Sequence, residues 1–131
     1  TNIDVRNAIL NLESKMNEPV FKKLDLEAFH HFAKGVYIRE LFMPAGSIVT
    51  SKIHKTEHFA LVLSGVVTVV QEDGERLIEA PYMQITKPGT KRALYVHEDT
   101  VWITIHPTSA TTVEEVEEEI IAKDFSEFEE S

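Results

Sequence analysis

Residues 51–74, SKIHKTEHFALVLSGVVTVVQEDG, hold two histidines four positions apart, followed by a long run of β-branched and apolar residues. His54 to His58 matches the H-x-x-E-H pattern of inverted zinc peptidases, which needs a helix so that both imidazoles share one face. The flanks are instead rich in valine, isoleucine and threonine, have no helical apolar period, and are interrupted by Gly65. The stretch is therefore predicted to form strands, and the peptidase interpretation is disfavoured.

The same β-forming texture extends over residues 36–107. Short runs of β-branched and aromatic residues alternate there with turn residues, and all five glycines lie at breaks between runs. Asp73-Gly74 separates two alternating segments, a strong signal for a two-residue hairpin, and His97-Glu98-Asp99 has the character of an exposed hairpin tip. Many short strands at this spacing predict an all-β barrel or sandwich.

Amphipathic helices are expected on both sides of this region. Apolar side chains recur at steps of three and four in residues 2–17, which predicts a helix that is followed by a connector. Near the other end, Thr112 to Glu115 has the form of a capping box, and a helix with a narrow apolar stripe follows it. The predicted parts are a helix and connector (1–35), a barrel (36–107) and an acidic helix and tail (108–131).

Composition excludes several classes of function. The 131 residues suffice for one domain, and the absence of cysteine removes disulfides, thiol nucleophiles and cysteine-ligated zinc. The net charge is −9, and residues 114–131 hold nine acidic residues against one lysine. A nearly neutral body with an acidic tail argues against nucleic acid as a partner. No apolar run is long enough to span a membrane, and we expect a cytoplasmic protein.

Two separated motifs resemble those of the cupin superfamily. The first combines Gly46 and His54 with Val62-Leu63-Ser64-Gly65, and the second is Lys87-Pro88-Gly89-Thr90-Lys91-Arg92. Longer stretches, HHFAKGVYIRE, IHKTEH and GTKRALYVHEDTVWITIHPT, are similar to small cupins of phages and prophages. The resemblance implies an all-β fold, a double-stranded β-helix or jelly-roll barrel, with flanking helices. It also implies a homodimer, in the host bacterial cytoplasm if the protein is phage-encoded, or in the virion.

The resemblance places four residues in the slots of the usual cupin metal ligands, namely Lys52, His54, His58 and Arg92. Only one of these slots keeps its usual residue, and His58 replaces a glutamate. Positive charge at Lys52 and Arg92 is unfavourable beside a divalent ion unless an anion is bound as well. The sequence therefore departs from the family pattern at its most characteristic place.

Three interpretations remain open, two with a working pocket and one without. In the first, His54, His58 and His106 hold one divalent transition metal, Zn, Fe, Ni or Mn. In the second, the histidines act with Lys52 and Arg92 to bind a small anion such as a carboxylate or sugar phosphate, without a metal. In the third, the protein is a structural or interaction protein, such as a virion component, and the histidines are merely hydrogen-bonded.

Other residues near these motifs have simpler expectations. Trp102 shares a strand face with His106 and either lines the barrel or stacks on a ligand. Arg39 and Glu40 are expected on the surface of an early strand. His30 and His31, where the connector meets that strand, are expected to serve packing.

Overall fold

The structure is a computed structural model, which describes residues 7–10 and 26–122. Residues 7–10 are helical, in agreement with the helix predicted for residues 2–17. The rest of that prediction, and the acidic tail from Lys123 onward, lie outside the described residues. Among the described residues, no helix has the length and apolar character needed to cross a membrane.

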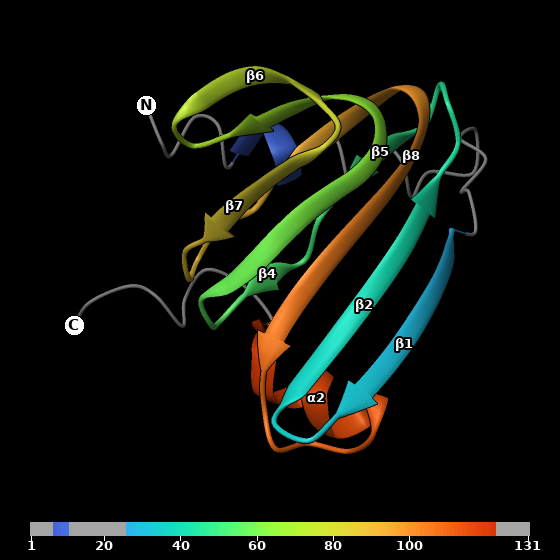
Figure 1. The fold of residues 1–131 in the computed structure, drawn as a ribbon. Helices are drawn as coiled ribbons and strands as arrows, with labels where there is room; N and C mark the ends of the chain where they lie inside the picture. The colour runs from blue at the N-terminus through green and yellow to red at the C-terminus, as the bar shows by residue number, and fades with distance from the viewer. Residues whose placement is uncertain (1–6, 11–25, 123–131) are drawn as a thin grey trace, which may run out of the picture.

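The described chain is mostly antiparallel sheet, so the predicted all-β class is confirmed (Figure 1). One sheet has the order β1-β2-β8-β5-β6, with β3 added to β8 and β7 added to β5, and β4 pairs separately with β9. The elements are β1 (Glu27–Ala33), β2 (Val36–Met43), β3 (Ile48–Thr50), β4 (Ile53–His54), β5 (His58–Gln71), β6 (Gly74–Glu79), β7 (Tyr82–Thr86), β8 (Ala93–Pro107), α2 (Val113–Ile120) and β9 (Ile121–Ala122).

The two longest strands, β5 and β8, run side by side and bend together, which folds the sheet over on itself (Figure 1). Their register shifts three times between Val62 and Val67, at the bend. Gly65 lies there with φ of +104°, and a Cβ on it would collide with the Thr100 side chain and the Asp99 carbonyl. The bend therefore requires glycine at position 65.

The inward side of the folded sheet carries the core. Side chains alternate along β2 and β8, so that residues at every second position face the interior. The larger buried cluster is apolar and consists of Leu41, Met43, Ala60, Val62, Val67, Val69, Ile78, Leu94, Val96 and Trp102. A second cluster joins Val116 and Ile120 of α2 to Tyr37 of β2, and so docks the helix against one end of the barrel.

The start of helix α2 agrees with the predicted capping box. The Thr112 side chain accepts a hydrogen bond of 3.2 Å from the Glu115 amide. The helix ends at Ile120, and the next two residues pair with β4, matching Ile121 to His54. The helix and β9 together therefore lie against the strand that carries the first histidine of the opening motif.

Three local expectations were wrong or displaced. The predicted connector contains a strand, β1, which pairs along its whole length with β2. His97-Glu98-Asp99 is no hairpin tip, because it lies within the unbroken β8, although His97 is exposed as expected. The hairpin predicted at Asp73-Gly74 does form, but Gln71 pairs with Gly74, so its two-residue loop is one position earlier than predicted.

His30 and His31, expected to serve packing, are both exposed on β1. His30 is hydrogen-bonded to the Tyr37 hydroxyl at 2.6 Å, and His31 contacts the Glu40 carboxylate at 3.1 Å. Both contacts run between β1 and β2, so the pair helps to fasten the edge strand that the sequence did not predict.

Candidate metal centre and cavity

Three strands bring three histidines together inside the barrel. His58 begins β5 on its inward face, in line with Ala60 and Val62, and His54 ends the short β4. His106 lies near the end of β8, whose pairing with β5 matches the neighbouring Ile105 to Phe59. His58 and His106 are buried and His54 is partly buried, and we call these three residues the histidine triad. The predicted third partner of His54 and His58 is thus next to them.

The triad is compact. The ring centroids lie 4.5 Å apart for His54 and His58, 4.3 Å for His58 and His106, and 5.6 Å for His54 and His106. One ring nitrogen from each histidine can be chosen so that all three lie within 4.8 Å of one another. Such nitrogens can converge on a single ion after small side-chain adjustments, because a zinc–nitrogen bond is about 2.0–2.1 Å long.

Hydrogen bonds hold two of the rings and leave one nitrogen of each without a partner. His58 Nδ1 donates to the Thr56 carbonyl at 3.0 Å, so its Nε2 carries the lone pair. His106 Nε2 is bonded to the Thr104 hydroxyl at 2.9 Å. Within the described residues, buried His54 Nδ1, His58 Nε2 and His106 Nδ1 have no hydrogen-bond partner. Three orphaned nitrogens in one place fit a metal ion, since metal-ligating histidines typically bond through their other nitrogen.

The triad is electrostatically suited to stay neutral. Burial lowers the pKa of His54 to about 3, and the nearby His58, His106, Arg92 and Arg39 add to this effect. Burial also lowers the pKa of His106 to about 3, with His58 and Arg39 contributing. The pKa of His58 is lowered mainly by burial, against the opposing effect of its bond to Thr56. All three imidazoles are therefore neutral near pH 7, the form that binds metals.

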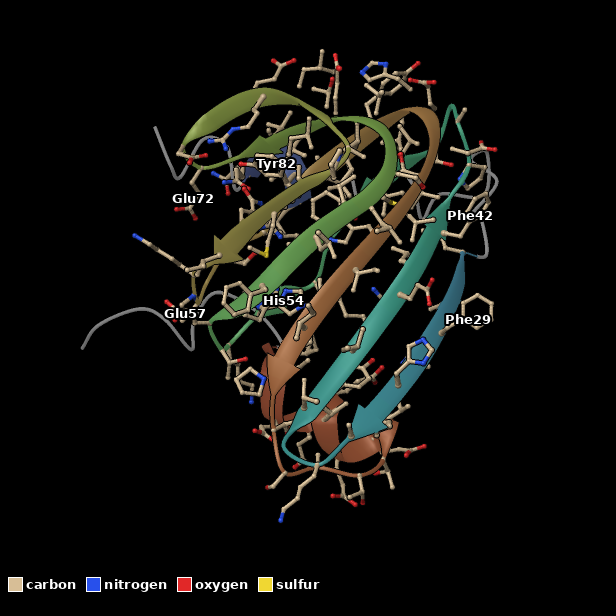
Figure 2. The ribbon with its side chains drawn as sticks, viewed as in Figure 1. Phe29, Phe42, His54, Glu57, Glu72 and Tyr82 are labelled. Atoms are coloured by element: carbon tan, nitrogen blue, oxygen red, sulfur yellow. The ribbon has the colours of Figure 1, made fainter. Side chains whose placement is uncertain are left out.

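A cavity of about 190 Å³ opens beside the triad. Five of the six predicted site residues line it, namely Lys52, His54, Arg92, Trp102 and His106. The sixth, His58, contacts the rings of His54 and His106. Glu57, the acidic residue of the opening motif, is exposed at the outer edge of the molecule, whereas His54 lies behind β5 (Figure 2). The peptidase interpretation, which needs that glutamate at the metal, has no support here.

Arg92 is almost completely buried, with 3% of its surface exposed. Its Nε donates to Gln71 Oε1 at 2.8 Å and its Nη2 donates to the Thr86 hydroxyl. The guanidinium carbon lies 5.6 Å from the centroid of the Trp102 ring. Burial lowers the pKa of Arg92 to about 10, partly offset by Asp73 and Tyr82, so the group stays charged. Trp102 thus both lines the barrel and stacks with a cation.

Two charged residues of the cavity were missed by the sequence prediction. Arg39, expected at the surface, is only partly exposed and lines the cavity from β2, on the same face as Tyr37 and Leu41. The period-two alternation of that strand was the signal that could have found it. Glu117 of α2 lines the same cavity and is exposed. Nothing in the sequence around Glu117 distinguishes it from the other glutamates of this helix.

Among the comparisons with known proteins, the one with solved structures identifies the fold. No protein-family model matches the sequence, and no curated protein matches it. Among solved structures, a cupin superfamily protein from Desulfitobacterium hafniense DCB-2 aligns with a TM-score of 0.55 and 12% identity, over 63% of this chain and 77% of the other. The chain has the cupin fold.

Other solved structures have a similar likeness to this chain. A putative ethanolamine utilization protein Q from Salmonella typhimurium LT2 aligns with a TM-score of 0.56 and 8% identity, over 68% of this chain and 74% of the other. The Fe(II) form of HppE with an alternative substrate aligns with a TM-score of 0.54 and 11% identity, over 66% of this chain and 52% of HppE. At these identities the likeness concerns the fold alone.

Proposed function

We propose that this cupin binds one divalent transition-metal ion through His54, His58 and His106, and uses the open side of the ion to bind a small molecule in the adjoining cavity. The observation that carries the proposal is the cluster of three histidines, each of which has one buried ring nitrogen without a hydrogen-bond partner and can offer one ring nitrogen within 4.8 Å of the others. Leaving three buried nitrogens unsatisfied is costly, and one ion satisfies all of them.

The chemistry of the donor atoms supports a transition-metal ion at the triad. Neutral imidazole suits zinc, iron and nickel, while manganese prefers oxygen ligands and is the weakest match for three histidines. The bond from His58 to the Thr56 carbonyl leaves Nε2 available and fixes the ring. Three protein ligands would leave the ion able to take a further ligand, as in catalytic sites and unlike closed structural ones. The iron in the HppE structure shows that one protein of this fold holds such an ion.

The competing proposal is a scaffold protein, such as a virion component, with no working pocket. A specific observation favours it, because large apolar side chains are exposed on the outer face of the sheet. It predicts a barrel mouth filled by side chains, however, and the cavity beside the triad speaks against that. Phage or prophage origin remains a prediction from the sequence resemblance.

The test is metal analysis of protein purified without a histidine tag and then incubated with Zn²⁺, Fe²⁺ or Ni²⁺ and desalted. We expect about one ion per chain in the wild type and loss of that ion in the His54→Ala/His58→Ala double variant. His97→Ala is the matched control, because His97 is exposed and its ring contacts Thr68 on the outside. No retained metal in the wild type, or equal metal in the double variant, would refute the proposal.

A further inference from the structure

We infer that the cavity beside the triad binds a small organic monocarboxylate, whose charged group is held by Arg39 together with Arg92 and whose apolar body lies against Trp102. This deepens the proposed function by naming the class of ligand that shares the metal's open side. It rests on that proposal only for the position of the metal, because the two arginines can hold the carboxylate without it.

The lining of the cavity has an excess of positive charge. Three cationic residues line it, Arg39, Lys52 and Arg92, against the single carboxylate of Glu117. Among the described residues neither arginine forms an ion pair, and the bonds of Arg92 go to the neutral side chains of Gln71 and Thr86. A buried guanidinium without a directly paired carboxylate is expensive, and a divalent ion in the triad would raise the positive charge further. An anion would offset both costs.

Arg39 is placed to meet a ligand that also reaches the metal. In the pairing of β2 with β8, Arg39 is directly opposite Thr104, whose hydroxyl is bonded to His106. Residues directly opposite in an antiparallel pair have Cβ atoms about 4.5–5.5 Å apart. The Arg39 side chain therefore starts beside the triad and extends into the same cavity, where its planar fork can bind a carboxylate through two hydrogen bonds.

Neighbouring side chains hold Arg92 rigidly at the cavity. Its bonds to Gln71 and Thr86 and its contact with Trp102 fix the guanidinium before any ligand arrives. A prearranged cation loses little conformational entropy when a ligand binds. Lys52 is exposed and lines the same cavity, so it contributes attraction at the entrance.

The size and the rest of the lining define the ligand. A volume of 190 Å³ corresponds to roughly a dozen water positions, which suits a short organic acid and excludes a sugar nucleotide. Leu41, Leu94 and Trp102 offer an apolar wall that inorganic phosphate could not cover. The carboxylate of Glu117 would repel a second negative group. These features favour one carboxylate on an apolar body of a few carbons.

The experiment uses the emission of Trp102, which is the single tryptophan of the chain. Metal-free and Zn²⁺-loaded protein are titrated with 3-methylbutanoate, with its uncharged amide, with succinate and with inorganic phosphate. We expect a saturable change with 3-methylbutanoate in both forms, and affinities at least about tenfold weaker for the amide, as for loss of a charge-assisted hydrogen bond. Succinate and phosphate should also bind more weakly.

Variants locate the binding. Arg39→Gln should weaken 3-methylbutanoate about tenfold or more, whereas Arg76→Gln, which changes an exposed arginine on β6 bonded to Tyr82, should not. No saturable change with 3-methylbutanoate, equal affinity for the amide, or an unaffected Arg39→Gln variant would overturn the inference. Carboxylate binding without retained metal would uphold it and refute the metal centre, while retained metal without carboxylate binding would do the reverse.

Discussion

His58 and His106 have ring centroids 4.3 Å apart, although one begins β5 and the other lies near the end of β8. The antiparallel pairing of these strands, which matches Phe59 with Ile105, brings the two rings together on the inward face. A shift of the pairing by one residue would turn one ring outward. The candidate metal site therefore depends on the same register that builds the barrel.

The first prediction concerns pH. Because the pKa values of His54 and His106 are about 3 in the folded protein and near 6.5 when unfolded, protons bind preferentially to the unfolded chain between these limits. Stability of the metal-free protein should be full above pH 6.5. It should fall as the pH drops toward 3, by up to about 1.4 kcal/mol per pH unit for each histidine that stays neutral.

Urea denaturation at a series of pH values measures this slope. His54→Asn removes one of the titrating groups, so the variant should have a shallower dependence on pH than the wild type. A free energy of unfolding that is unchanged between pH 7 and pH 5 would contradict the neutral triad.

The second prediction concerns the bend. Gly65→Ala should destabilise the fold by about 3 kcal/mol or more, because the new Cβ meets Thr100 and the Asp99 carbonyl and the backbone keeps a positive φ. Thermal unfolding measures the loss. Gly35→Ala is the matched control, since Gly35 also has positive φ but open space around it, and it should cost clearly less. Equal losses would show that the close approach at the bend is unimportant.

The third prediction concerns the helix that closes one end of the barrel. Ile120 is 3% exposed, packs with Tyr37 and lines the cavity, so Ile120→Ala should cost about 2–5 kcal/mol. Glu118→Ala, at an exposed position of the same helix, should change stability by no more than about 0.5 kcal/mol. Chemical denaturation compares the two. A loss of the same size in both variants would mean that α2 is not docked through Ile120.

The fourth prediction concerns the homodimer expected from the sequence. Phe59, Leu63, Met83 and Ile85 are between 44% and 61% exposed, and they lie on β5 and β7 on the side away from the core. We expect two copies to pair through this outer face, because its side chains at these four positions are apolar and exposed, and apolar faces of this kind mark interfaces.

Light scattering after size exclusion should give twice the monomer mass for the wild type. The double variant Phe59→Glu/Ile85→Glu, which changes two register partners on that face, should give the monomer mass with an unchanged circular dichroism spectrum. A monomeric wild type, or a variant that stays dimeric, would rule out this interface. Phe29 and Phe42, which are also exposed, project from the sheet at β1 and β2 (Figure 2), and the double variant leaves them unchanged.

Much of the site was predictable, because its residues alternate along strands. Period-two spacing placed Trp102 and His106 on one face of β8, and the same rule applied to β2 would have placed Arg39 inside. The strand β1 was less accessible, since EAFHHFA mixes charged, aromatic and histidine residues without clear alternation. Its extended form comes from pairing with β2.

The sequence by itself determined the β-forming character of residues 36–107, the helix cap at Thr112 and the choice of His54 and His58 as candidate ligands. Each of these depends on neighbours along the chain. Only the tertiary structure decided that His97-Glu98-Asp99 lies within β8 and that Glu117 of α2 lines the same cavity as Arg92 and two histidines of the triad. These outcomes depend on the pairing of β5 with β8 and on the docking of α2, contacts between distant segments that no local pattern encodes.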